Sequence, residues 1–241
     1  MDGVLDKQYA SQRKLKKYLE FRYKERALAS VSAIRRYLGQ HDTIRLIDLG
    51  AAEGLTLLEI ARILGRGEYI GIEYDQGLIA SAPKLPGNVH LAQGDVNDMR
   101  VFHDNSIDVI TALALLEHLE NPALALKECF RILRPGGLFV ATAPMSRWEH
   151  IADSFGPKNE FGGEHHQSDI TRSSMENLSK SAGFEFIDYR KFMWAPVAFL
   201  PYFKIGISPR FAWAVDALIE KIKIANLLFV NQRFVLKKPM V

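Results

Sequence analysis

An apolar segment that runs directly into a turn of small residues constrains the fold of this chain more than any other feature. The segment is Leu46-Ile47-Asp48-Leu49-Gly50-Ala51-Ala52-Glu53-Gly54. It predicts a buried strand closed by Asp48, a tight turn at Gly50, and a helix whose free N–H groups follow Gly54. A strand, turn and helix in this order form a binding site for a nucleotide-sized ligand.

A second apolar segment ends in a carboxylate. Tyr69-Ile70-Gly71-Ile72-Glu73 predicts a neighbouring strand, and Glu73 lies 23 positions after Gly50. This spacing is close to the rule of an acidic residue about 20 residues beyond a glycine-rich turn, where it accepts hydrogen bonds from ribose hydroxyl groups. The two signals together predict a nucleoside site at the carboxyl ends of two parallel strands.

The turn does not suit a dinucleotide. A pyrophosphate fingerprint needs glycine at the positions that Ala52 and Leu55 occupy here. Asp48 would also repel a diphosphate, whereas its charge suits a ligand that carries an ammonium or sulfonium group. The site therefore favours a cationic nucleoside.

Five motifs occur in an order that resembles the class I S-adenosylmethionine-dependent methyltransferases, in the branch that methylates small molecules. The resemblance covers residues 44–144, and its motifs are Asp48–Gly54, Glu73, Gln93–Val96, Ser106–Leu119 and Arg131–Gly137. It implies that S-adenosylmethionine is the cofactor. The turn would surround its methionine part, Glu73 would bind the ribose, and Asp95 would accept a hydrogen bond from the adenine amino group.

The resemblance and the turn chemistry together give a set of expected cofactor-binding residues: Asp48, Gly50, Ala51, Glu53, Gly54, Glu73, Asp95, Val96 and Ala112. One position departs from the family pattern, because Ala52 stands where the family often has glycine. Its methyl group narrows the permitted backbone angles. This departure keeps open a second interpretation, a cofactor-binding module without catalysis.

Strand and helix patterns alternate from residue 44 onwards. They predict a Rossmann-like, doubly wound α/β fold with a mostly parallel sheet and helices on both faces. The expected strands are 45–49, 68–73, 89–93, 107–112, 137–143, 184–187 and one between 227 and 236. The resemblance implies seven strands with the last one antiparallel. Asn121 and Pro122 should start one helix, and a capping box at Ser173 and Glu176 should start another.

The chain divides into an N-terminal helical extension, residues 1–42, and a methyltransferase domain, residues 43–241. In the extension, apolar residues recur every three or four positions, and one face is basic. That face is either a solvated surface or a contact for an anionic partner. In the resembled family such helices often cover the active site, so the extension is also a candidate lid.

Two segments depart from a minimal domain. Residues 145–170 are rich in glycine, aromatic residues and histidine, and they predict a loop that covers the active site. Residues 192–224 form an apolar insertion, in which Pro196, Pro201 and Pro209 forbid one continuous helix. Three interpretations of the insertion stay open: a packed core or homodimer interface, an apolar acceptor pocket, and a peripheral membrane contact.

His118 and His166 are the candidate catalytic residues. A hydroxyl acceptor needs a base, and neutral imidazole can take a proton near pH 7. His118 follows the fourth predicted strand, and His166 lies in the predicted cover loop. The alternative for Glu117 and His118 is that they begin and cap the next helix. No metal site is predicted, because neighbouring histidines such as His165 and His166 seldom bind one ion well.

The absence of two motifs narrows the range of possible methyl acceptors. The Asn/Asp-Pro-Pro-Tyr loop and any Pro-Cys pair are absent from the sequence, so nucleic acid is not expected as a partner. The predicted function is methyl transfer to a small, partly apolar or lipid-like acceptor, with O-methylation favoured. The alternative enzyme acts on a lipid or protein at a membrane surface, with the basic helix and residues 192–224 forming one patch.

Composition agrees with a cytoplasmic enzyme. The 241 residues carry a net charge of +3, are 48% hydrophobic and include one cysteine, Cys129. No signal-peptide pattern and no apolar run of about 20 residues is found, so export and membrane spanning are not expected.

Overall fold

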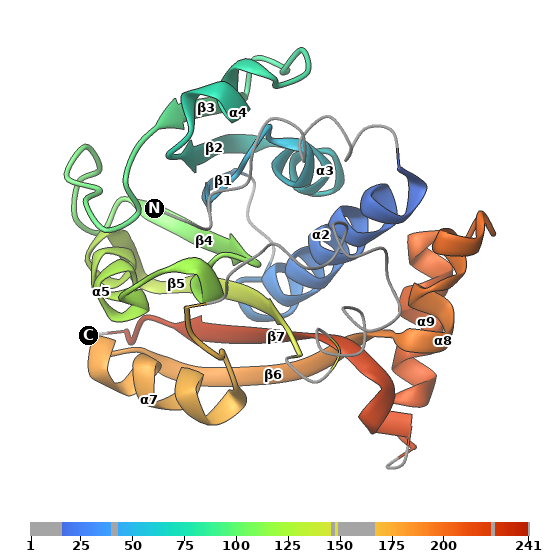
Figure 1. Cartoon of the computed structure of the whole chain (residues 1–241). Coiled ribbons are helices and arrows are strands. Elements are labelled where there is room, and N and C mark those ends of the chain that lie inside the picture. The colour runs from blue at the N-terminus through green and yellow to red at the C-terminus, as the bar shows by residue number, and fades with distance from the viewer. Residues whose placement is uncertain (1–15, 40–42, 146–147, 149–166, 223–224, 241) are drawn as a thin grey trace.

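The structure is a computed structural model that describes residues 16–39, 43–145, 148, 167–222 and 225–240. Its centre is one seven-stranded sheet with the order β3-β2-β1-β4-β5-β7-β6 (Figure 1). The strands are β1 (Ile44–Leu49), β2 (Gly67–Glu73), β3 (Val89–Gln93), β4 (Ile107–Leu113), β5 (Leu133–Pro144), β6 (Glu185–Trp194) and β7 (Phe229–Lys237).

Strand directions confirm the predicted fold. The pairs β1·β2, β2·β3, β1·β4 and β4·β5 are parallel, whereas β7 runs antiparallel to both β5 and β6. All strands except β7 therefore point the same way, and their carboxyl ends lie along one edge of the sheet. In a doubly wound sheet this edge is where ligands bind.

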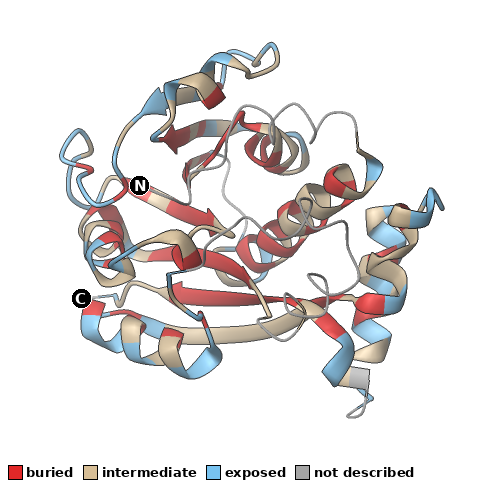
Figure 2. Cartoon of the chain, in the orientation of Figure 1, coloured by how far each residue is buried: buried red, intermediate tan, exposed pale blue. Residues whose placement is uncertain are grey.

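Helices cover both faces of the sheet. One face is covered by α2 (Lys17–Tyr37) and α3 (Leu55–Leu64), and the other by α5 (Pro122–Ile132) and α7 (Arg172–Ala182), while the short α4 (Gln76–Ala80) follows β2. Neighbouring strand residues face opposite cores, because Leu46 packs with α2 and α3 and Ile47 packs with α5 and α7. Figure 2 shows buried residues concentrated in the strands and on the inner sides of these helices.

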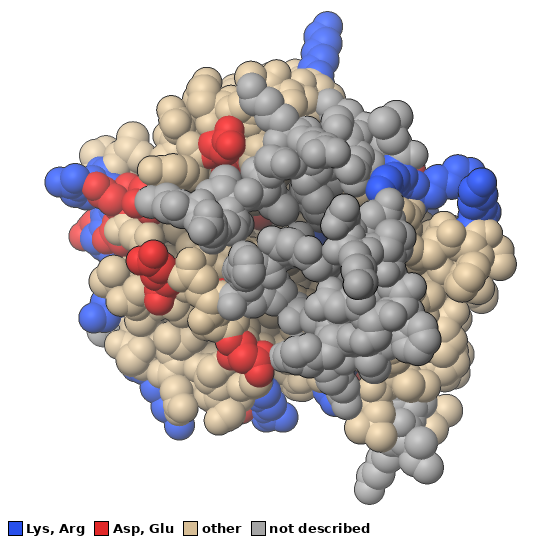
Figure 3. All heavy atoms as spheres, viewed as in Figure 1, with Lys and Arg blue, Asp and Glu red and all other residues tan. Residues whose placement is uncertain are grey.

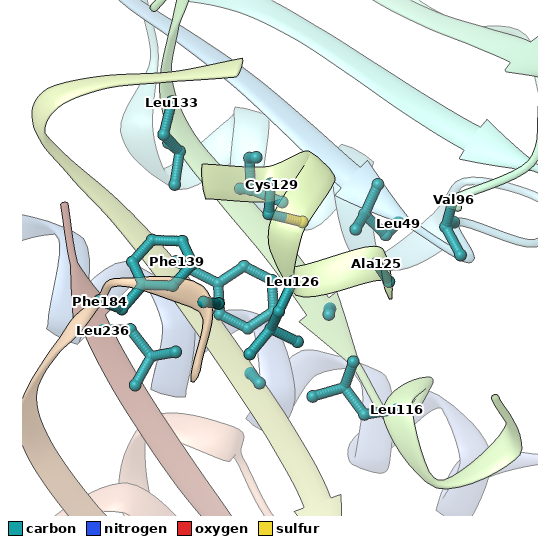
Figure 4. Close-up of a cluster of buried hydrophobic side chains, with 14 of the residues drawn as sticks. Leu49, Val96, Leu116, Ala125, Leu126, Cys129, Leu133, Phe139, Phe184 and Leu236 are labelled. Carbon is teal, nitrogen blue, oxygen red and sulfur yellow. The ribbon is translucent and has the colours of Figure 1, made fainter. Parts of the chain in front are cut away.

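The core between the sheet and α5 holds the single cysteine. Cys129 is fully buried among apolar side chains such as Leu126 and Phe139 (Figure 4). Burial raises the pKa of its thiol far above the usual range. Cys129 therefore has a packing role, as its place among apolar residues at helical spacing predicts.

The helix α2 is part of the helical layer that covers one face of the sheet. It is fixed by the buried Arg233 of β7, which donates to the backbone oxygen of Ala29 at 2.9 Å and to Ser32 Oγ at 2.7 Å. Arg233 also forms an ion pair with Asp188 of β6. The predicted boundary at residue 42 falls between α2 and β1. Residues 1–15 and 40–42 of the predicted extension, which is also the candidate lid, lie outside the described residues.

Several details differ from the sequence prediction. The helix α7 is capped by Thr171 and Ser174, whose side chains bond to each other's backbone N–H groups, so the predicted capping box at Ser173 and Glu176 is wrong. Glu176 instead pairs with Arg172. Asn121 does precede α5, but its side chain makes no capping hydrogen bond.

The strand β5 begins earlier than predicted. Leu133 already pairs with Ile107, and the next pair joins Val109 to Leu138. The four intervening residues, which include Pro135, are absorbed by this break in register. A proline cannot donate to a ladder, and such irregularities are where sheets tolerate it.

The insertion between β6 and β7 forms short helices, as its prolines predict. They are α8 (Ala195–Ala198), the 3₁₀ helix η2 (Leu200–Phe203), α9 (Pro209–Ile219) and the 3₁₀ helix η3 (Ala225–Leu228). The helix α9 packs on α2 and on β6. Asp216 of α9 is buried and accepts hydrogen bonds from the backbone N–H groups of Met193 and Trp194, at 2.7 and 2.9 Å.

A second buried carboxyl group, Glu25 of α2, lies in the field of Asp216. Burial first, and the charge of Asp216 second, raise the pKa of Glu25 to about 9. Burial likewise raises the pKa of Asp216 to about 6, although its two backbone hydrogen bonds oppose this shift. Glu25 is therefore protonated at neutral pH in the folded chain.

Replacing Glu25 by glutamine is expected to stabilise the protein at pH 8.5 by about 1 to 3 kcal/mol, with little effect near pH 4.5. Above the ordinary glutamate pKa of 4.5, the unfolded chain has released a proton that folded Glu25 keeps until about pH 9. The free energy of unfolding therefore falls as pH rises through this window, and glutamine removes the fall. Urea unfolding at pH 6.0 and 8.5 measures the difference. Glu20→Gln, on the same helix at a half-exposed ion pair with Lys24, is the control, and a wild-type stability that stays level between the two pH values would contradict the assignment.

Candidate active site

The predicted turn closes over the ends of β1 and β2. The backbone N–H groups of Gly50 and Ala51 both donate to the oxygen of Ile72, at 2.8 and 3.1 Å. Gly50 and Gly54 have φ of +65° and +80°, which glycine adopts freely. Ala52 has φ of +49°, so the alanine that departs from the family pattern is held in the left-handed region. The helix α3 then starts at Leu55, and its N-cap residue, Gly54, makes no side-chain cap hydrogen bond.

Gly71, in the middle of β2, lies directly under this turn. A Cβ atom at Gly71 would lie 2.4 Å from Leu91 Cδ2 and 2.6 Å from Ala51 Cβ. No real contact is that short, so only glycine permits the observed approach of β2 to the turn. Gly71 is not among the site residues predicted from the sequence. The available signal was a glycine inside an apolar strand two positions before the carboxylate.

Glu73 is held firmly by backbone N–H groups. Its Oε2 accepts from Ala52 at 2.8 Å, and its Oε1 accepts from Tyr74 at 2.8 Å and from Asp75 at 3.0 Å. Three of the about four lone-pair sites of the carboxylate are therefore used by the protein. One position that can accept a hydrogen bond remains on Oε2. It suits one ribose hydroxyl group, whereas the sequence-based prediction has Glu73 accept from both hydroxyl groups.

Asp95 lies just beyond the end of β3, and β3 pairs with β2, the strand that ends at Glu73. Its Oδ1 accepts from the backbone N–H of Asn97 at 2.8 Å and from the side-chain amide of Asn97 at 3.1 Å. The side chain is exposed, whereas the neighbouring Val96 is buried in the core. Asp95 is thus oriented by a local turn, and its side chain is exposed just beyond the end of β3.

Two predicted cofactor residues lie inside strands. Asp48 belongs to β1, where it is buried and its Oδ1 accepts from Thr111 Oγ1 at 2.6 Å. Ala112 is fully buried in β4 and pairs in register with Leu49 and Ala141. The residue at the following turn is Ala114, whose φ is +57°. Glu53, also predicted, is fully buried within the turn after β1.

His118 ends the 3₁₀ helix η1 (Leu116–His118), which follows β4 and precedes α5. The alternative prediction, that Glu117 and His118 begin and cap the next helix, is wrong, because α5 starts only at Pro122. The backbone oxygen of Glu117 accepts from the N–H groups of Gln167 and Ser168. His118 is therefore held at the carboxyl edge of the sheet beside residues 167–168, half-buried. His166, the other candidate base, lies outside the described residues.

An aromatic cluster lies beyond the other half of this edge. Trp148 follows β5, Phe199 and Tyr202 follow β6, and Tyr18 comes from the first turn of α2. The ring of Phe199 lies 6.1 Å from Trp148 and 5.6 Å from Tyr202, and Tyr18 stacks on Tyr202 at 4.1 Å. Of the predicted cover loop, residues 145–170, the structure describes 145, 148 and 167–170, and the other positions lie outside the described residues. Trp148 belongs to the predicted cover loop, and Phe199 and Tyr202 belong to the apolar insertion, but no sequence signal brings Tyr18 to them.

The carboxyl edge therefore has two chemically different halves. Polar groups and tight turns gather over β1, β2 and β3, and aromatic side chains gather beyond β5 and β6. The turns after β1 and β4 meet, because a Cβ atom at Gly50 would lie 2.8 Å from Leu115 Cδ1. The described residues contain no group of three His, Cys, Asp or Glu side chains that could hold a metal ion. The groups present are two carboxylates, which accept hydrogen bonds, at the ends of adjacent strands, and a glycine-containing turn. They fit a nucleoside with a cationic substituent.

Comparison with known proteins gives matches in the same region. Residues 47–141 match a family described as a methyltransferase domain. A probable S-adenosylmethionine-dependent methyltransferase of Mycolicibacterium smegmatis is 30% identical over 143 residues, which are 59% of this chain and 52% of that protein. The ubiquinone biosynthesis O-methyltransferase of Cupriavidus pinatubonensis is 22% identical over 162 residues, which are 64% of this chain and 65% of the relative.

Among solved structures, phosphoethanolamine N-methyltransferase 2 of Haemonchus contortus, in complex with S-adenosyl-L-methionine, has the same fold. The TM-score is 0.62 at 16% identity, over 87% of this chain and 52% of that one. This chain thus spans between about half and two thirds of the length of these three proteins. The matched domain contains the turn after β1, Glu73, Asp95 and His118.

Proposed function

We propose that this chain, which belongs to the class I S-adenosylmethionine-dependent methyltransferases, transfers a methyl group to an oxygen atom of a small, partly apolar acceptor. The observation that carries this proposal is the division of the carboxyl edge into a polar half and an aromatic half. The polar half suits the nucleoside of the cofactor. The aromatic half suits an acceptor that offers an apolar or aromatic surface.

The chain's own residues have separable tasks in this proposal. Glu73 and Asp95 orient the cofactor through hydrogen bonds, and the Gly50 turn shapes the space beside its methionine part. When bound, S-adenosylmethionine would supply a methyl group on a sulfonium sulfur, which would leave as the neutral thioether of S-adenosylhomocysteine. Holding the acceptor oxygen in line, near van der Waals contact with that carbon, is the main contribution asked of the protein.

His118 is proposed to accept the proton of the acceptor hydroxyl group. It follows β4, the strand between the two halves of the edge, and it is neither fully buried nor distant from them. The O-methyltransferase activity named for the Cupriavidus pinatubonensis relative supports oxygen as the acceptor atom. A lipid-like quinone or phenol has both a suitable hydroxyl group and an apolar body.

We expect His118→Gln to lower kcat about 100-fold with a hydroxyl acceptor, because glutamine keeps a polar side chain but cannot take the proton. A panel of phenols and quinols with apolar substituents, and matched amines, is incubated with S-adenosylmethionine, and S-adenosylhomocysteine formation is measured. The affinity for S-adenosylhomocysteine should be unchanged in the variant. In a plot of kcat against pH, the fall of kcat at low pH, where the histidine base becomes protonated, should be absent from the variant.

Two results would contradict this proposal. Wild-type activity in the His118→Gln variant would remove His118 from the proton transfer. Turnover of the amines alone would replace oxygen by nitrogen as the acceptor atom. If no compound is methylated although S-adenosylhomocysteine binds, the non-catalytic interpretation, which the left-handed Ala52 keeps open, becomes the better one.

A further inference from the structure

We propose that the outer face of α9 and its flanking segments dock on an anionic lipid surface. The helix has an unusual distribution of residues. Its inward face contains the buried Ala212 and Asp216, whereas its outward face presents Phe211 and Leu218, which are 55% and 67% exposed. Ile222 continues this outward line one turn beyond Leu218. The face that should be polar in a soluble domain is apolar instead.

The apolar surface continues on both sides of the helix. Phe203, which is 75% exposed, and Ile205 precede α9, and the exposed Leu227 and Leu228 follow it. The segment η3 is attached to the end of α9, because the side-chain amide of Asn226 donates to the oxygen of Glu220 at 2.9 Å. We call the exposed apolar residues of this region the α9 face: Phe203, Ile205, Phe211, Leu218, Ile222, Leu227 and Leu228.

The charges within the α9 face are basic. Lys204, Arg210 and Lys221 are exposed among its apolar side chains. Residues 195–222 contain two acids, of which Asp216 is buried and Glu220 pairs with Arg190 at 3.1 Å. In Figure 3 the edge of the molecule formed by α9 is mainly tan, with Lys and Arg side chains at its upper end. Apolar residues mixed with exposed basic ones are typical of surfaces that lie in the headgroup region of anionic membranes.

The start of the basic helix α2 lies beside the α9 face. Tyr18 stacks on Tyr202 of η2, which directly precedes Phe203, and Lys16 Nζ lies 5.8 Å from the Tyr18 ring. Lys17 is exposed on the same first turn. These two lysines extend the basic rim. The sequence predicts one patch that joins the basic helix to the insertion. We propose that the first turn of α2 is the part of the helix that belongs to this patch.

A second copy of the chain is a poorer occupant of the α9 face. In a two-fold symmetric dimer the same patch meets itself. Lys204, Arg210 and Lys221 would then come close to their own copies in a dehydrated interface, and like charges repel there. Anionic headgroups supply the opposite charge and a boundary for the apolar side chains. No helix among the described residues is long and apolar enough to cross a membrane, so contact is proposed at the surface only.

This inference goes beyond the proposed methyl transfer and does not depend on it. The aromatic cluster that contains Phe199 and Tyr202 adjoins the α9 face through η2. When the protein is docked, the aromatic half of the carboxyl edge, where the methyl acceptor is proposed to bind, would lie next to the lipid surface. The chemical class that such an arrangement serves is a lipid-borne acceptor with a polar head.

Vesicle flotation tests the docking without any turnover. Vesicles of phosphatidylcholine alone, or with about 30% phosphatidylglycerol, are mixed with the full chain at low and high salt. We expect flotation with the anionic vesicles and its loss at high salt. Phe211→Asn with Leu218→Asn should lower vesicle partitioning at least about tenfold. Lys204→Gln with Lys221→Gln should lower it about 25-fold, or fivefold per charge.

Matched exposed positions elsewhere serve as controls. Val101→Asn and Lys84→Gln replace exposed residues outside the α9 face and should leave partitioning unchanged. All variants should keep the far-ultraviolet circular dichroism of the wild type, since every replaced side chain is exposed. A wild-type chain that ignores anionic vesicles overturns the proposal. A Phe211→Asn/Leu218→Asn variant that still floats also overturns it, and a dimer that this variant dissociates would assign the α9 face to a second copy.

Discussion

Replacing Glu73 by glutamine is expected to weaken S-adenosylhomocysteine binding about 100-fold and to destabilise the fold by about 1 to 3 kcal/mol. Both oxygens of the Glu73 carboxylate accept from backbone N–H groups, Oε2 from Ala52 and Oε1 from Tyr74 and Asp75. Glutamine has only one acceptor oxygen. Its amide nitrogen must therefore face at least one N–H donor, and the turn around Ala52 has to move or lose its hydrogen bond.

The matched variant for this test is Glu68→Gln. Glu68 lies on the same strand, but its side chain is half-exposed and forms a surface ion pair with Arg45. Surface pairs of this kind contribute about 0 to 1 kcal/mol, so stability and cofactor affinity should hardly change. Calorimetric titration and urea unfolding of both variants measure the contrast. Equal affinity in Glu73→Gln and wild type would remove Glu73 from the site.

Gly71→Ala is expected to lower cofactor affinity at least about tenfold and to destabilise the domain by about 1 to 3 kcal/mol. The new methyl group would lie 2.6 Å from Ala51 Cβ, and that atom has no rotamer by which it can move away. The turn must shift away from β2, although Gly71 itself contacts no ligand in this account. The neighbouring Leu91 contact, at 2.4 Å, can relax by rotation of the leucine side chain.

A double variant separates the two contacts. Adding Ala51→Gly to Gly71→Ala removes the contact that cannot relax, and we expect it to restore part of the lost affinity. Gly87→Ala is the control, because a Cβ atom at Gly87 meets nothing within 4 Å. Titration with S-adenosylhomocysteine reports the effect on the site. Unchanged affinity in the single variant would show that β2 and the turn are not coupled as described.

The sheet could be predicted from sequence because its signals are local. The segments ending at Leu49 and Glu73 are short apolar runs bounded by turn residues, and their order alone indicates a parallel sheet. The sequence-based predictions are wrong where tertiary contacts determine the start of a strand or the cap of a helix. Pro135 predicts a break before β5, but pairing of Leu133 with Ile107 carries the strand across it. The cap of α7 used Ser174, because Thr171 already occupied the N-cap position.

The placement of Glu73 and Asp95 at the ends of neighbouring strands could be predicted from the sequence, because each lies at or just beyond the end of one strand. Contacts between distant segments were not predictable. Nothing in the sequence pairs Thr111 with Asp48, and nothing brings Tyr18 onto Tyr202. The glycine requirement at Gly71 arises from packing between two strands and a turn. Such requirements depend on three-dimensional distances, so a periodic pattern does not contain them.

We propose that the turn after β1, Glu73 and Asp95 form a site for S-adenosylmethionine. Calorimetric titration of the wild-type chain with S-adenosylhomocysteine tests it most directly. We predict one site per chain with a Kd near the micromolar range, weakened by about 1 to 3 kcal/mol in Asp95→Ala through loss of a hydrogen bond to adenine. A folded wild-type chain that binds no S-adenosylhomocysteine would contradict the account.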